Sequence, residues 1–328
     1  RDDVVDNWKR GLVKLTEHYR WDAVVVHAVP GRATPIEVPE PMGVNQWRDS
    51  RGCRVQYSED TDYFAVVEKP GRPAEAAAPP AGSPVLTDPT DDELEVVRHV
   101  VRELGRTHFI VGAALCPKPF PRPRFYGYAD ATRSEVEDWV DVYDDPDAIA
   151  ESRLKAVTGP AVRRGIELAK REQIDAIAYG HDYGCSSGPF LSPELFRRAI
   201  FPALKVYADI VHSFGLLMVH HCCGYNLPLI DQMIEAGVDV YQSVQAEMDL
   251  AVLKKRYGAN LAFWGGVPAG LLVTGTPDEV RAAGKKAIDI GKPGGGFIYS
   301  TSHSVMPGAK PENYRAMLDA LAEHGAYR

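Results

Sequence analysis

Two histidines and two cysteines stand side by side where the apolar run LLMV ends, at His220, His221, Cys222 and Cys223. If this run is a β-strand, residues two apart share a face, so His221 and Cys223 form one pair and His220 and Cys222 the other. A His-x-Cys pair at a strand end can offer an imidazole and a thiolate to one metal ion, and this donor mixture suits zinc. Gly224 lets the backbone turn sharply beside such a site.

Other donor side chains follow other apolar runs. Glu247 comes just after the run 238–245, and His303 closes the run 296–303. If these runs are parallel strands of one barrel, their carboxyl ends meet at one rim. We therefore expect His221, Cys223 and His303 to bind zinc, with Glu247 or an open position as the fourth ligand. The alternative is that the His-Cys pair is ordinary core packing with a hydrogen bond.

A pocket beside this metal would be lined by polar residues near the same strand ends. Asp182 could hold a substrate amine or another protonated group, or it could be a carboxylate that stabilises its loop. Tyr183, Gln242 and Gln245 are further candidates for contact with a small-molecule substrate. Because Gln242 and Gln245 lie three residues apart, a regular strand would not aim both inward, and one of them should be structural.

Eight apolar runs alternate with helical patterns, and most are continuous, as expected for strands buried on both faces. The runs are 22–29, 63–69, 108–115, 174–182, 216–223, 238–245, 261–267 and 296–303. We predict an α/β fold, a single (β/α)8 TIM barrel over residues 1–328, with an open doubly wound sheet as the alternative. Residues 68–92 are rich in Pro, Ala and Gly and predict an irregular excursion, and 116–135 predicts a loop that is either a substrate lid or a packed surface loop.

Helix boundaries are marked by capping residues. Ser192 and Thr276 each precede a proline and an acidic residue and predict N-caps, the first opening a helical segment that extends to Gly215. The segment 91–105 has apolar residues at helical spacing and ends on Gly105, and the last helical segment ends at Gly325.

Composition excludes several classes of protein. The formal net charge of −8 argues against nucleic-acid binding, and no apolar run is long enough to predict a transmembrane helix. The first ten residues have no apolar stretch of the kind found in a signal peptide. Five cysteines, an odd number with two adjacent, do not suggest a disulfide framework, so we expect a reducing, cytoplasmic setting.

The segment from Gly180 to Gly224 resembles the uroporphyrinogen decarboxylase superfamily. The matching positions are Asp182, Gly184, Gly188, Pro189, Ser192, Pro193, Glu194, Pro202, His221, Cys223 and Gly224. The resemblance continues through EAGVDVYQS, FWGGV, GTPDEV, GGGFIYS and PENYRAM, and it covers about residues 140 to 325. It implies a (β/α)8 barrel, in agreement with the strand count, and one of two chemistries.

The first chemistry is zinc-dependent methyl transfer with a corrinoid. Members of that branch carry His-x-Cys-Gly and usually a cysteine on the last strand, where this sequence has His303. This branch implies zinc as cofactor, and a corrinoid that arrives on a partner protein or free in solution, because the chain contains no corrinoid-binding Asp-x-His-x-x-Gly motif. Barrels of this family often pair, so a homodimer is a further expectation.

The second chemistry is metal-independent decarboxylation of a carboxylated substrate. The arginine-bearing Met-Arg-Gln-Ala-Gly-Arg stretch typical of these decarboxylases is missing, and the nearest equivalent is the single Arg32 in HAVPGRATP. A smaller acid could be bound by Arg32 and processed by Asp182 and His303. A third alternative is a non-catalytic barrel that binds a corrinoid or tetrapyrrole.

Overall fold

The computed structural model describes residues 2–29, 31–33, 39–48, 53–58, 63–68, 89–113, 142–306 and 308–327. The expected loop at 116–135 lies outside these residues, as do residues 69–88 of the expected excursion at 68–92.

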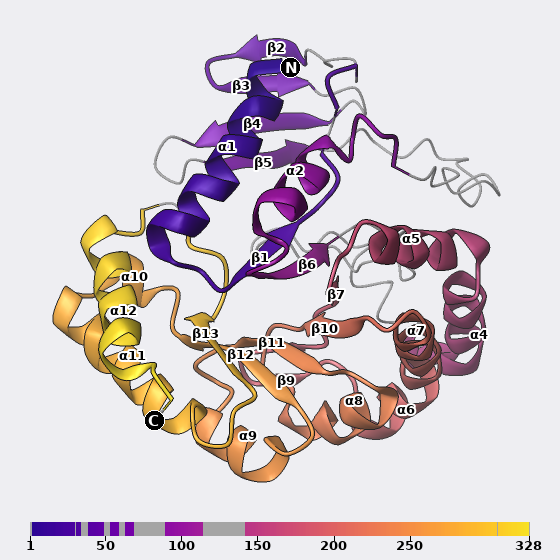
Figure 1. Ribbon diagram of the computed structural model, residues 1–328. Helices are drawn as coiled ribbons and strands as arrows, with labels where there is room; N and C mark the ends of the chain where they lie inside the picture. The colour runs from indigo at the N-terminus through magenta and orange to yellow at the C-terminus, as the bar shows by residue number, and fades with distance from the viewer. Residues whose placement is uncertain are drawn as a thin grey trace.

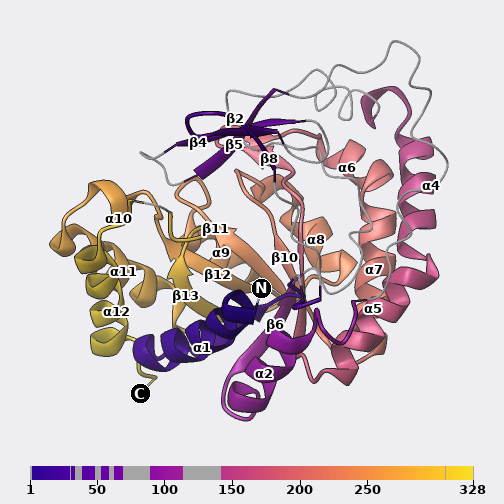
Figure 2. The ribbon, with the colours of Figure 1, turned by 90° about the horizontal axis from the view of Figure 1, so that it is seen from above.

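The centre of the molecule is a curled sheet of seven parallel strands with helices on its outer face (Figures 1 and 2). The strands, in both chain and spatial order, are β1 (Ala23–Val26), β6 (Phe109–Ala113), β7 (Ala176–Gly180), β10 (Leu217–His221), β11 (Val240–Val244), β12 (Ala262–Val267) and β13 (Phe297–Thr301). Each neighbouring pair is parallel. The α/β, TIM-barrel-like fold class predicted from the sequence is therefore confirmed, in the form of a partial barrel.

One of the eight predicted strands belongs to a different sheet. The run 63–69 forms β5 (Tyr63–Glu68), which pairs antiparallel with β4 (Arg54–Ser58). The rest of this four-stranded sheet is β2 (Glu40–Gly43) and β3 (Gln46–Arg48). A continuous apolar run indicates a strand but not its partner, and here the nearest strand in the chain is the partner.

Helices follow most strands and cover the outside of the sheet (Figure 2). They are α1 (Asp2–Tyr19), α2 (Glu95–Leu104), α4 (Pro146–Val157), α5 (Pro160–Arg171), α6 (Pro193–Ala199), α7 (Phe201–Ser213), α8 (Ile230–Ala236), α9 (Leu250–Tyr257), α10 (Leu271–Thr274), α11 (Pro277–Gly291) and α12 (Pro311–His324). Among the described residues, none of the helices is both long and apolar enough to cross a bilayer.

The helix caps follow the sequence prediction, with one difference. The Ser192 side chain accepts from the backbone N–H of Leu195, and Thr276 forms a capping box with Glu279. The predicted helical segment from Ser192 to Gly215 is two helices, because Pro202 cannot continue a helix through the preceding turn.

The first and last helices meet beside the two edge strands of the sheet. The indole N–H of Trp21, just after α1, donates to the Tyr314 hydroxyl of α12 at 2.9 Å. The ring of Tyr19 packs edge-on against the ring of Tyr314. Helix α1 thus lies between α12 and α2 on the outside of the barrel (Figure 2).

The sheet separates two apolar cores. The small inner core contains Val111, Ala176, Val219 and Val240, one from each of four neighbouring strands. The larger outer core lies between the sheet and the helices. Since side chains alternate along β10, the residue after Val219 faces the helices, and the next, His221, stands directly above the inner core at the carboxyl end of the strand.

Candidate metal centre

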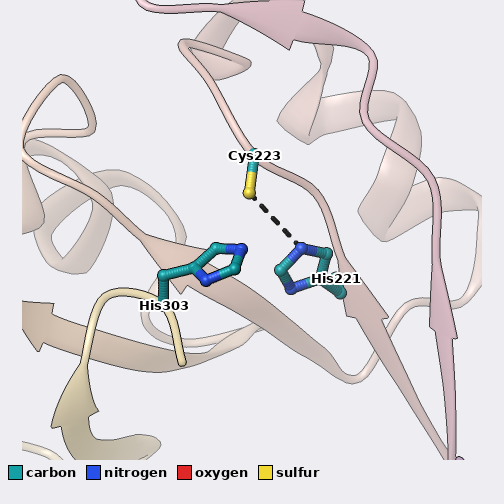
Figure 3. A group of neighbouring side chains, drawn as sticks. All are labelled: His221, Cys223 and His303. Atoms are coloured by element: carbon teal, nitrogen blue, oxygen red, sulfur yellow. Dashed lines mark hydrogen bonds between the residues drawn. The ribbon is translucent and has the colours of Figure 1, made fainter. Parts of the chain in front are cut away.

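Three nitrogen and sulfur donors converge at the carboxyl ends of β10 and β13. Ligand atoms of His221, Cys223 and His303 all lie within 4.8 Å of one another (Figure 3). The Cys223 Sγ is 3.3 Å from His221 Nε2, and the two imidazole rings stand edge-to-face with their centroids 5.5 Å apart. The structure thus brings together the three residues that the sequence singled out as ligands.

The spacing and chemistry of these donors fit a zinc ion. With bond lengths of about 2.0–2.3 Å, tetrahedral zinc places its nitrogen and sulfur donors about 3.4 Å apart. The distance of 3.3 Å between the Cys223 Sγ and the His221 Nε2 matches that spacing. The ligand atom of His303 lies within 4.8 Å of the other two, so small side-chain rotations would bring it to the same spacing. Three protein ligands leave one position open, as in catalytic rather than structural zinc sites.

The second nitrogen of His221 is oriented by Gln242 on the neighbouring strand. His221 pairs with Gln242 in the β10–β11 ladder, and its Nδ1 is hydrogen-bonded to the Gln242 Oε1. Because an amide oxygen can only accept, Nδ1 carries the proton and Nε2 presents its lone pair. This is the tautomer that a ligand nitrogen needs at Nε2, and metal-bound histidines generally have such an outer partner.

The charge state of the other two ligands is set by burial. Burial, and then the nearby Asp182 carboxylate, raise the pKa of the Cys223 thiol to about 12. Burial also lowers the pKa of His303, so this imidazole stays neutral and able to bind a metal. A cation among these groups would reverse the preference of Cys223, because metal coordination deprotonates a thiol.

Asp182 lies against the ligand loop. Its Oδ1 accepts from the backbone N–H of Cys223 at 2.7 Å and lies 3.8 Å from His221 Nε2. The side chain is 39% exposed, so a bound molecule could still reach it. The carboxylate therefore makes a contact of the loop-stabilising kind, which is one of its two predicted roles, and its role toward a substrate stays a prediction.

The loop after Cys223 is held by a residue that the sequence did not single out. Asn226 is fully buried, and its side-chain amide donates to the carbonyls of Cys223 and Gly224. Gly224 adopts φ of +88°, and a Cβ there would lie 2.5 Å from the backbone of Gly184. The Gly-x-Asn spacing after the cysteine is the signal that would have identified this anchor.

Two more predicted residues lie near the site in different ways. Gln245 Oε1 accepts from the backbone N–H of Gly224 at 2.9 Å, so Gln242 and Gln245 both contact the ligand segment. Because Gln245 bonds a backbone N–H of the ligand loop, its contact is the structural one expected for one member of the pair. The register of β11 shifts between Gln242 and Val244, just before Gln245. Glu247 does not belong to the three-residue cluster, although its charge contributes to the raised pKa of Cys223.

Tyr183 and Arg32 have partners other than the three donors. Tyr183 is fully buried and stacks between His181 and His220, so it offers no exposed surface to a bound molecule. The Arg32 guanidinium is surrounded by carboxylates and donates to Glu95, Asp6 and Asp2. These ion pairs link α1, α2 and the segment after β1.

The family model described as uroporphyrinogen decarboxylase (URO-D) matches residues 49–324. The chain belongs to the URO-D family. It is 26% identical over 234 residues to a uroporphyrinogen decarboxylase of Streptomyces griseus, and 26% identical over 241 residues to one of Thioalkalivibrio sulfidiphilus. These matches cover 71% and 70% of this chain but only 60% and 64% of those relatives.

A solved structure supports the fold of this URO-D family member. A methyltransferase from Methanosarcina mazei superposes with a TM-score of 0.61 and 18% identity, covering 98% of this chain and 86% of that one. At this identity the likeness establishes the shared fold. The family match and the shared fold agree in placing the chain in the URO-D superfamily.

Proposed function

We propose that this chain is a zinc-dependent methyltransferase that moves a methyl group between a corrinoid and a thiol or another soft nucleophile. The observation that carries the proposal is the cluster of His221, Cys223 and His303 donors at the carboxyl ends of two barrel strands. The Methanosarcina mazei protein that shares the fold is itself named a methyltransferase.

The residues of the site have distinct tasks in this proposal. His221, Cys223 and His303 would hold the ion, and Gln242 keeps Nε2 of His221 free to bind it. Zinc held there would supply an open position at which a substrate thiol loses its proton at neutral pH. The Asp182 carboxylate, 3.8 Å from Nε2 of His221, would receive that proton or hold a substrate amine. The corrinoid would arrive on a partner protein or as a free cofactor.

The proposal is tested by following methyl transfer from methylcobalamin to a panel of small thiols. We expect turnover by protein reloaded with zinc and none after treatment with a chelator. Replacing His303 by alanine should abolish turnover, because the remaining pair cannot retain the ion. Turnover that is unaffected by the chelator would refute a zinc enzyme.

Decarboxylation is the second candidate, and it is favoured by the curated relatives, both named uroporphyrinogen decarboxylase. Asp182 and His303 would then act on a carboxylated substrate without metal. The ion pairs of Arg32 with three carboxylates weaken its candidacy as the anchor for substrate carboxylates. Carbon dioxide release from a carboxylated substrate that survives both chelation and Cys223→Ala would favour this function. Tight corrinoid or tetrapyrrole binding without any turnover would favour a non-catalytic barrel.

A further inference from the structure

Strand β11 departs from regular geometry beside the metal centre. Its register against β12 shifts between Gln242 and Val244, so Ser243 is the extra residue of a β-bulge. Ser243 is fully buried and has φ of +93°, a backbone conformation that residues other than glycine rarely adopt. Strained residues persist only where their surroundings enforce them, and they often cluster at functional sites.

The bulge brings two consecutive side chains to the same site. In a regular strand Gln242 and Ser243 would face opposite sides of the sheet. Here the Gln242 Oε1 accepts from His221 Nδ1, while the Ser243 Oγ lies 3.4 Å from the Cys223 Sγ. The same hydroxyl lies 3.0 Å from the Ser302 carbonyl, whose residue directly precedes His303. His221 and Cys223 are therefore each hydrogen-bonded to a residue of the bulge, and His303 directly follows a residue that is.

The opposite strand has a residue that makes room for the bulge. Gly265 of β12 pairs with Val244 and has φ of +138°. A Cβ on Gly265 would lie 2.9 Å from the Val244 backbone nitrogen and 3.1 Å from its carbonyl oxygen. A side chain there would force the bulge to move, although Gly265 itself contacts none of the ligands through a polar group.

We propose that the Ser243 bulge positions the metal ligands, with Gln242 fixing the His221 tautomer and Ser243 tying the Cys223 sulfur to the His303 strand end. The inference rests on the proposed function, since it requires a metal at these ligands. The hydroxyl proton of Ser243 can be donated to the Ser302 carbonyl or to the sulfur. Gln242, Ser243 and Gly265 are thus positioning residues.

The test measures zinc affinity by competition with a chromogenic chelator, and ligand geometry from the absorption spectrum of the cobalt(II)-substituted protein. Gln242→Ala and Gly265→Ala should each weaken zinc binding by about 10- to 100-fold and alter the thiolate-to-cobalt absorption, as loss of outer partners does elsewhere. Gln242→Glu should stay within a few-fold of the original affinity, because a carboxylate oxygen also accepts from Nδ1. Ser243→Ala should change the cobalt spectrum while leaving the strand in place.

The matched control is Gly237→Ala at the end of α8. Gly237 also has a positive φ, +101°, and a Cβ there would lie 3.1 Å from Ala208, so the substitution strains the backbone away from the ligands. It should lower thermal stability and leave zinc affinity unchanged. The positioning role would be overturned if Gln242→Ala and Gly265→Ala both kept the original zinc affinity and cobalt spectrum while His221→Ala lost zinc. That result would leave the zinc site itself supported. Absence of zinc binding by the unmodified protein would overturn both.

Discussion

Two histidine-cysteine pairs at the carboxyl end of β10 have opposite surroundings. His221 and Cys223 face the barrel interior and meet His303. His220 and Cys222, each one residue earlier, face the helix layer and are completely buried. The His220 ring stacks between Tyr179 and Tyr183, at centroid distances of 5.4 and 5.5 Å. The alternation of side chains at the end of β10 and in the two residues after it therefore separates candidate ligands from buried core residues.

The outward pair is kept neutral by burial. Burial lowers the pKa of His220 to about 3 and raises the pKa of Cys222 well above its ordinary value. Among the described residues, neither belongs to a cluster of metal-binding donors. The comparison shows that residue type and sequence proximity do not make a metal site, because the donors must also converge where a ligand can enter.

The largest expected effect is on metal binding. Cys223→Ala should weaken zinc affinity by more than about 1,000-fold, because a thiolate ligand is lost and three protein donors become two. Cys222→Ala should retain one zinc per chain, since its sulfur lies on the other face of the sheet. Zinc content by plasma emission spectroscopy after dialysis distinguishes the two variants. Equal loss of zinc in both would contradict the assignment of the faces.

A smaller effect is expected on stability in acid. His220 has a folded-state pKa of about 3, below its ordinary 6.5, so protons bind preferentially to the unfolded chain. Its contribution to stability is complete above pH 6.5 and is lost as the pH falls toward 3. Between pH 7 and pH 4 this loss should be about 3 kcal/mol. His220→Phe should remove this pH-dependent loss from the free energy of unfolding, as measured by urea unfolding at both pH values.

The control for this experiment is Cys222→Ala, which changes the other outward side chain and keeps His220. In the metal-free state this variant should lose stability between pH 7 and pH 4 as steeply as the unmodified protein. An equally steep loss in His220→Phe would show that the outward imidazole is not the group that titrates.

The smallest expected effect is on thiol reactivity in the metal-free protein. Hydrogen bonding from Ser187 lowers the pKa of Cys185, whereas Cys223 has a pKa of about 12 and Cys222 is buried. Iodoacetamide at pH 8 should therefore alkylate Cys185 at least about tenfold faster than Cys223, because the thiolate is the reactive form. Cys222 should react only after unfolding. Peptide mass spectrometry over time gives the three rates, and rapid alkylation of Cys222 in the folded protein would contradict the account.

Much of the fold could be predicted from the sequence. Seven of the eight apolar runs form the parallel sheet in chain order, because continuous apolar runs separated by capped helices favour that arrangement. The run 63–69 lies in a different sheet from the predicted one, since its apolar pattern contains no information about its partner. The break near Ile200 could have been read from Pro202.

The part of the candidate site that lies at strand ends could be predicted from the sequence. His221, Cys223 and His303 come together because carboxyl ends of parallel strands share a rim. The roles of Gln242 and Ser243 depend on a bulge, which local propensity does not predict, although the Gly265–Gly266 pair in β12 is the kind of signal that accompanies one. Tyr183 follows Asp182 directly, yet it turns into the outer core, where it packs against Phe196.

The most direct test of the central claim is X-ray absorption at the zinc edge of protein purified without chelator. The account predicts about one zinc per chain, bound by one sulfur near 2.3 Å and by nitrogen or oxygen donors near 2.0–2.1 Å. The sulfur scattering should disappear in Cys223→Ala and persist in Cys222→Ala. A zinc-free protein, or a bound zinc without any sulfur neighbour, would contradict it.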